Sequence, residues 1–213
     1  MSGIGSFRSC VVLRIALLLV VCSVCRVATA GNNPYDDQTW SRLDAGEIVL
    51  SVSVDPMTNG RRRLAGVVVA IIDTPPHRVW ETILDHDRYS EFMPYLQDCT
   101  VVEDNGLSRI VFYQVSVGWT VITYYLLLSY DPSQWLVEGA LDKTRPHQIA
   151  DTHCVWKLEP LDGGIRTIAS YSVTLDTGRQ IPYLVEQLLV SWQLPHMMEN
   201  VRQRAVSGGT WMR

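Results

Sequence analysis

The sequence lacks the motifs that mark the common enzyme classes. Its 213 residues contain no GxSxG, Walker, HExxH or dinucleotide-binding pattern, so the nucleophilic, zinc and phosphate-binding chemistries are without their usual signatures. Lysine is almost absent, with only Lys143 and Lys157, and the net charge is -4. An acidic chain has no general attraction for nucleic acid. We therefore expect no nucleic-acid partner.

Cysteine is scarce too, and its spacing excludes the usual zinc sites. Three of the five cysteines fall within residues 1–30, which leaves Cys99 and Cys154 without any CxxC pair. In the sheet expected below, these two lie on strands that are not neighbours, whereas a disulfide needs Cα atoms within about 7 Å. We expect two separate buried thiols, no metal site and no cofactor.

The N-terminus has an apolar run, Ile15 to Val21, that is too short for a bilayer, which needs about 20 apolar residues. Arg8 and Arg14 precede it, and the small-x-small sequence Ala28 to Ala30 follows. This order predicts a signal peptide over residues 1–30, cut after Ala30, and export to the periplasm or beyond. A retained anchor and a lipoprotein are the alternatives. The remaining 183 residues (213 minus 30) suffice for one domain.

A strand followed by two short helices is predicted for residues 64–93. Leu64 to Ile72 is an apolar run typical of a buried strand. Thr74 can cap the next helix, with Pro75 and Pro76 in its first turn. One apolar helical stripe follows, formed by Val79, Trp80, Ile83 and Leu84. Asp85, His86 and Asp87 then predict a capping turn between two helices, rather than a metal site.

Alternating apolar and β-branched segments, separated by turn pairs such as Asn105-Gly106, predict an antiparallel sheet of about seven strands. After Ile181 the apolar period changes to that of an amphipathic helix, which Pro195 should kink. About 25 helical residues span roughly 38 Å. Seven strands span roughly 29 Å. One helix can therefore cross the whole sheet.

The order of these segments resembles the START-like, or helix-grip (SRPBCC), superfamily. The similarity is to secreted bacterial members of its polyketide cyclase/dehydrase and coenzyme-Q-binding branch. It is carried by Pro75 to Leu96 (PP..VW..L.D..RY.EFMPYL), Trp40 to Glu47, Trp156 to Pro160 and Tyr171 to Pro182. The resemblance implies an α+β fold, with a curved antiparallel sheet gripping a long C-terminal helix around a hydrophobic cavity. We assign residues 31–46 to an N-terminal extension, 47–207 to the domain and 208–213 to a tail.

The resemblance also implies which side chains line the cavity, although adjacent strand residues cannot be assigned to a face from the sequence. Phe92 and Met93 are placed at the cavity mouth, where the second short helix can act as a lid. For each candidate, ordinary core packing is the alternative. The candidates are Phe92, Met93, Phe112, Tyr113, Tyr125, Trp156, Tyr171, Leu184, Leu188 and Trp192.

The function implied is binding or transport of a hydrophobic small molecule, such as a lipid, quinone, isoprenoid or polyketide-like compound. The alternative is a cyclase, aromatase or dehydratase that uses polar groups inside the cavity, with Arg109, Gln114, Tyr113, Tyr125 and Tyr171 as candidates. No acid and base stand at a diagnostic spacing, which favours binding over catalysis. A protein-interaction module is a third hypothesis. Transient membrane contact and the oligomeric state stay open.

Overall fold

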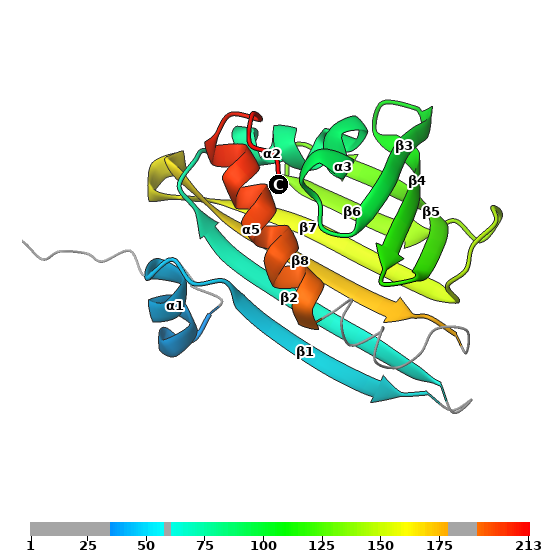
Figure 1. The fold of residues 1–213 in the computed structure, drawn as a ribbon. Coiled ribbons are helices and arrows are strands. Elements are labelled where there is room, and N and C mark those ends of the chain that lie inside the picture. Colours follow the sequence, from blue (N-terminus) through cyan, green and yellow to red (C-terminus); the bar gives the residue numbers. More distant parts are fainter. Residues whose placement is uncertain (1–34, 58–60, 179–190) are drawn as a thin grey trace, which may run out of the picture. The chain divides into compact units, whose positions relative to one another are not determined.

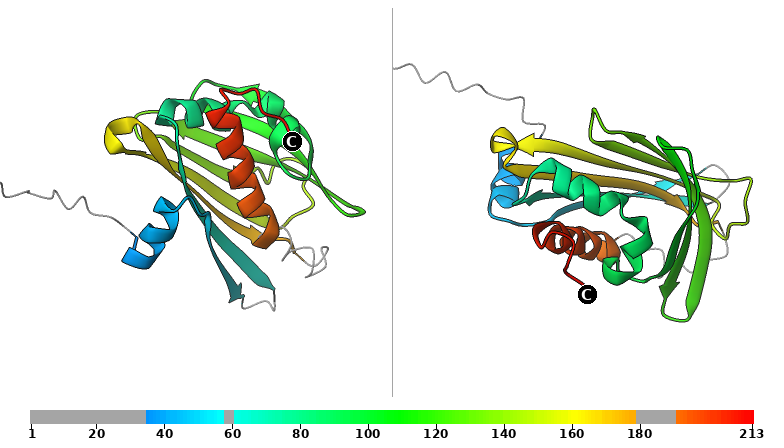
Figure 2. Two further views of the ribbon diagram at one scale, coloured as in Figure 1. Left: turned by 60° about the vertical axis from the view of Figure 1, so that its left-hand side comes forward. Right: turned by 90° about the horizontal axis from the view of Figure 1, so that it is seen from above.

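Eight antiparallel strands form one sheet, and the C-terminal helix α5 lies across one face of it (Figures 1 and 2). The structure, a computed structural model, describes residues 35–57, 61–178 and 191–213. The strand order is β1-β2-β8-β7-β6-β5-β4-β3, so β1 and β3 are the two edge strands of the sheet. The strands are β1 (Val49–Pro56), β2 (Arg62–Ile72), β3 (Leu96–Asp104), β4 (Ser108–Val117), β5 (Thr120–Asp131), β6 (Leu136–Leu141), β7 (Asp151–Leu161) and β8 (Arg166–Asp176).

The helices follow the predicted order. Their bounds are α1 (Asp37–Asp44), α2 (Pro76–Leu84), the 3-10 turn η1 (His86–Arg88), α3 (Tyr89–Phe92), the 3-10 turn η2 (Asp162–Gly164) and α5 (Gln193–Val206). The expected α+β helix-grip architecture is confirmed, with eight strands where about seven were expected. Within the described residues, no helix is long and apolar enough to cross a membrane.

The continuous apolar run of β2 is explained by cover on both faces. Val68 and Ala70 are fully buried on the face toward α5, where the main core lies. On the other face, Val69 and Ile71 are buried with Leu43 of α1. A strand covered on one face only would alternate apolar and polar residues, whereas one covered on both faces reads as an apolar run.

The start of α2 differs from the prediction. Its N-cap is Pro75, in extended backbone, and Pro76 is the first helical residue. Thr74 does not cap the helix; it is buried, and its carbonyl accepts a hydrogen bond of 2.7 Å from the hydroxyl of Thr167 on β8. The two prolines meet the geometric needs of the first turn without a side-chain cap.

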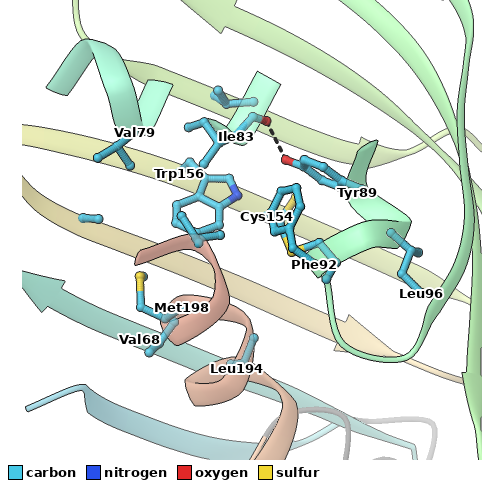
Figure 3. Packing of buried hydrophobic residues seen from close by; sticks show 14 of the residues in the cluster. Val68, Val79, Ile83, Tyr89, Phe92, Leu96, Cys154, Trp156, Leu194 and Met198 are labelled. Carbon is cyan, nitrogen blue, oxygen red and sulfur yellow. Dashed lines mark hydrogen bonds between the residues drawn. The ribbon is translucent and has the colours of Figure 1, made fainter. Parts of the chain in front are cut away.

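The C-terminal helix is described from Gln193, and Pro195 is the third residue of α5. The two residues before α5, 191 and 192, are π-helical, so Pro195 lies next to an irregular helical turn, the kind of irregularity that accompanies a proline inside a helix. The earlier part of the predicted helix, including Leu184 and Leu188, lies outside the described residues. Downstream, Leu194, Met198, Val201 and Ala205 are buried and pack into the main core (Figure 3).

Candidate ligand cavity

A cavity of about 180 Å³ lies between the inner face of the sheet, the α2–α3 region and the start of α5. Strands β3 to β8 each contribute inward side chains to it. Its described lining is Ile83, His86, Tyr89, Met93, Pro94, Leu96, Tyr113, Val115, Ile122, Tyr124, Leu126, Leu128, Val137, Ile149, Thr152, Cys154, Trp156, Tyr171, Val173, Leu175, Gln193, Leu194 and Met197. Most of these side chains are apolar, as in pockets for small organic ligands.

Two aromatic pairs line the cavity wall. Tyr113 on β4 and Tyr124 on β5 are register partners, and their rings stack with centroids 5.5 Å apart. Trp156 on β7 and Tyr171 on β8 are also register partners, with centroids 4.7 Å apart. Tyr113, Tyr124 and Tyr171 are only half-buried by accessible area, because part of their surface faces the cavity. Burial away from bulk water raises the pKa of all three hydroxyls.

The cavity contains four of the residues proposed from the sequence, namely Met93, Tyr113, Trp156 and Tyr171. Their contact with a ligand stays a prediction. Phe112 and Tyr125 do not line the cavity. Phe112 precedes Tyr113 and Tyr125 follows Tyr124, and neighbouring residues on a strand face opposite sides of the sheet. Their rings pair with each other there, with centroids 5.1 Å apart. The assignment of these two residues to the cavity is corrected.

Phe92 and Trp192 also lie away from the cavity lining. Phe92 is fully buried, and the guanidinium of Arg204 lies 5.3 Å from its ring centroid, so it anchors α3 to the core (Figure 3). Trp192 is 55% exposed, and its ring centroid lies 4.5 Å from that of His196 with the two rings tilted by 37°. The cause is local geometry. Phe92 ends a helical turn, whereas Met93 is already extended and its side chain turns toward the cavity.

The α3 segment, expected to act as a lid, is tied to α5 by side-chain hydrogen bonds. Asn200 donates to the carbonyl of Phe92 at 2.6 Å, and Gln193 donates to that of Pro94 at 3.1 Å. The buried guanidinium of Arg204 bonds the carboxylate of Glu91 at 2.7 Å. The α3 segment and α5 are therefore one connected unit on the helical side of the cavity.

His86 is a cavity residue that the sequence did not indicate. It is 3% exposed, and its Nε2 lies 3.0 Å from the hydroxyl of Tyr130 on β5. Burial and, to a lesser extent, the charge of Arg109 lower the pKa of His86 from 6.5 to about 3. The imidazole is therefore neutral at physiological pH. A usable signal was its position three residues after Ile83, which continues the spacing of the apolar stripe of α2 into η1.

Of the five polar side chains proposed for catalysis, Tyr113 and Tyr171 line the cavity, whereas Arg109, Gln114 and Tyr125 lie outside the lining. Arg109 on β4 donates to Asp104 at 2.8 Å and to the carbonyl of Leu84 at 3.2 Å. Gln114 faces the outer side of the sheet, where it bonds Gln97. Among the described lining residues none is Asp, Glu, Lys or Arg. The described wall is therefore uncharged.

Residues 72–202 match the family described as polyketide cyclase/dehydrase and lipid transport. The chain belongs to this family. The expected START-like recognition is thereby confirmed, while the coenzyme-Q and secretion parts of that expectation stay predictions. No curated protein matches the chain.

Several solved structures share the fold of this protein at low sequence identity. A STAR-related lipid transfer protein from Xanthomonas axonopodis has 14% identity and a TM-score of 0.58, with 76% of this chain and 98% of that chain covered. A START superfamily protein from Mycobacterium smegmatis has 12% identity and a TM-score of 0.55, covering 76% and 99%. The di-domain aromatase/cyclase BexL has 13% identity and a TM-score of 0.53, covering 71% and 51%. These similarities establish the fold alone.

Proposed function

We propose that this protein binds or carries a hydrophobic small molecule in the cavity between its sheet and α5. The observation that carries the proposal is the wall itself, which is largely apolar and has no charged side chain among the described lining residues. At about 25 cal/mol per Å², burying roughly 300 Å² of ligand surface contributes about 7 kcal/mol before entropy costs. Part of that contribution is offset by the translational and rotational freedom that the ligand loses on binding.

Binding has more support than catalysis. A general base works best with a pKa near the working pH. The pKa of His86 is lowered to about 3, which makes it a weak base at neutral pH. Burial raises the pKa of the lining tyrosines, so each stays a neutral hydroxyl. A cyclase or dehydratase remains the alternative, and it would need a proton-transfer group supplied within the cavity.

We also propose that the protein acts outside the cytoplasm, on the strength of the signal-like residues 1–30. An exported carrier would meet its ligand at or near a membrane, which fits a hydrophobic cargo. Protease mapping of the N-terminus in cell fractions tests this proposal. A full-length chain that begins at Met1 in the cytoplasmic fraction would overturn it.

Filling the cavity tests the binding proposal. Val173 on β8 is half-buried and faces the cavity, so Val173→Trp should occupy the space a ligand needs. Val67 on β2 is 42% exposed on the opposite face, and Val67→Trp is the matched control. The detergent-free proteins are incubated with a total lipid extract, and bound lipids are then extracted and weighed by mass spectrometry. We expect uptake by the native protein and the control, and at least a tenfold loss in Val173→Trp. Equal uptake by all three proteins would place binding outside the cavity.

A further inference from the structure

The turn between β4 and β5 presents a tryptophan that contributes nothing to the packing of the domain. Gly118 adopts a φ of 61° at the first position of this two-residue turn, and Trp119 occupies the second position with its side chain 100% exposed. A turn of this kind needs glycine at the positive φ but does not need an aromatic residue beside it. The ring of Trp119 is therefore available to a surface outside the domain.

The hairpin that presents Trp119 is uncharged. No Asp, Glu, Lys or Arg occurs between residues 109 and 131, and Val121, close to the turn, is 45% exposed. Hairpin turns usually consist of small polar residues, so an apolar tip is unusual. Exposed apolar surface bounded by polar groups is typical of contacts with a protein or a membrane.

Polar side chains form a rim around the hairpin, three residues back from its turn. Gln114 and Thr123 are register partners at this level; the side chain of Gln114 bonds Gln97 at 2.7 Å, and that of Thr123 bonds Gln148 at 3.1 Å. Asp98 of β3 lies at the same level, and no charged residue of β3, β4 or β5 lies nearer the turn. Three strand residues span roughly 10 Å. Apolar groups of peripheral proteins enter a bilayer to a similar depth, about 5–10 Å.

The tip of the hairpin adjoins the cavity. Val115 and Ile122 are register partners between the rim and the turn, and both side chains line the cavity. The β4–β5 turn and the start of α5 lie at the same end of the molecule (Figures 1 and 2). A surface that received Trp119 would therefore lie against the end of the hairpin that forms part of the cavity wall.

A second exposed tryptophan is connected to this end of the cavity. The carbonyl of Pro94 accepts a hydrogen bond of 3.1 Å from Gln193 of α5, and the carbonyl of Tyr95 accepts one of 2.8 Å from the backbone of β4. Trp192 directly precedes Gln193 and is 55% exposed. Trp119 and Trp192 are the only exposed aromatic side chains among the described residues. Tryptophan is enriched at membrane interfaces, because its ring is apolar and its N–H can still be hydrogen-bonded.

We propose that the β4–β5 turn docks on a lipid bilayer, with Trp119 in the headgroup region and the adjoining end of the cavity against the membrane. The surface it fits is one of electrically neutral lipids. The tip offers no cation, and a chain with a net charge of -4 is not attracted to anionic lipid. This docking does not depend on what the cavity binds, so its test is separate from that of the proposed function.

Co-sedimentation with phosphatidylcholine vesicles compares the native protein with Trp119→Ser and with the control Leu107→Ser. Leu107 is 65% exposed in the turn at the other end of β4, beside the ion pair of Asp104 and Arg109. All three proteins have the same N-terminus, so residues 1–30 act equally in each. We expect Trp119→Ser to weaken partitioning into the vesicles roughly tenfold or more, and Leu107→Ser to weaken it less than about twofold. Anionic phosphatidylglycerol should not strengthen binding, and high salt should not weaken it.

Quenching by brominated phosphatidylcholine shows whether Trp119 itself enters the bilayer. The fluorescence of the native protein minus that of Trp119→Phe isolates the emission of Trp119, which we expect to be quenched on the vesicles. Equal partitioning of native protein and Trp119→Ser with an unquenched Trp119, or no vesicle binding at all, overturns the docking. A native dimer that Trp119→Ser dissociates, without vesicle binding, assigns the tip to a second copy of the chain instead. Vesicle docking by a protein that takes up no lipid supports this proposal and contradicts the proposed function.

Discussion

Lowering the pH from 7 to 5 should destabilise the fold through His86. Its pKa in the folded protein is about 3, against about 6.5 in an unfolded chain. Between these values the unfolded state binds a proton that the folded state excludes, so stability falls as the pH falls. Each pH unit below 6.5 lowers the free energy of unfolding by about 1.4 kcal/mol. The loss at pH 5 is therefore about 2 kcal/mol, and it stops growing below pH 3.

Urea unfolding of the native protein and His86→Phe at several pH values isolates this contribution. The other four histidines are present in both proteins, and their effects cancel in the difference. The native curve should lose about 2 kcal/mol more than the variant curve between pH 7 and pH 5. The carboxylates with lowered pKa, such as Asp104 and Asp142, lose their contribution only at lower pH. Parallel curves would refute the reasoning and show that His86 accepts a proton in the folded state.

Three further predictions concern packing and the thiols. A Cβ on Gly139 would lie 2.7 Å from Cys154 Sγ and from Leu128 Cδ2, so Gly139→Ala should lower the free energy of unfolding by about 1–3 kcal/mol, measured in urea. Phe92→Ala should lower it by about 3–5 kcal/mol in the same assay, because Phe92 is fully buried; a change below 1 kcal/mol would contradict its anchoring role. Burial raises the pKa of Cys99 to about 12 and that of Cys154 to about 11, so neither should react with iodoacetamide at pH 8 until the protein unfolds. Mass spectrometry counts the adducts, and rapid labelling of the native protein would disprove the burial argument.

The arrangement of strands and helices follows from local patterns in the sequence. Asn105-Gly106 predicted a hairpin, and Gly106 adopts the positive φ of 84° that such a turn requires. The proline pair at 75–76 marked the start of α2. The buried thiols Cys99 and Cys154 lie on β3 and β7, which are not neighbours in the sheet, as expected. These features depend on a few adjacent residues, so the sequence specifies them.

The lining of the cavity depends on contacts between distant residues, which the local sequence does not specify. Phe112 and Tyr113, like Tyr124 and Tyr125, are adjacent aromatics, and a period of two fits either member facing inward. His86 is buried, and one of its contacts is with Tyr130, 44 residues away. A charged triplet such as Asp85-His86-Asp87 resembles an exposed turn unless that contact is known. The fold therefore determines which of two adjacent residues faces the cavity, whereas the sequence alone allows either.

Native mass spectrometry of the protein, purified without detergent and followed by denaturation and organic extraction, tests the central claim most directly. The account predicts one apolar molecule per chain, lost on denaturation. It also predicts that Val173→Trp purifies without that molecule while Val67→Trp retains it. A clean protein mass, with no uptake from a total lipid extract, would contradict the claim that this cavity holds a ligand.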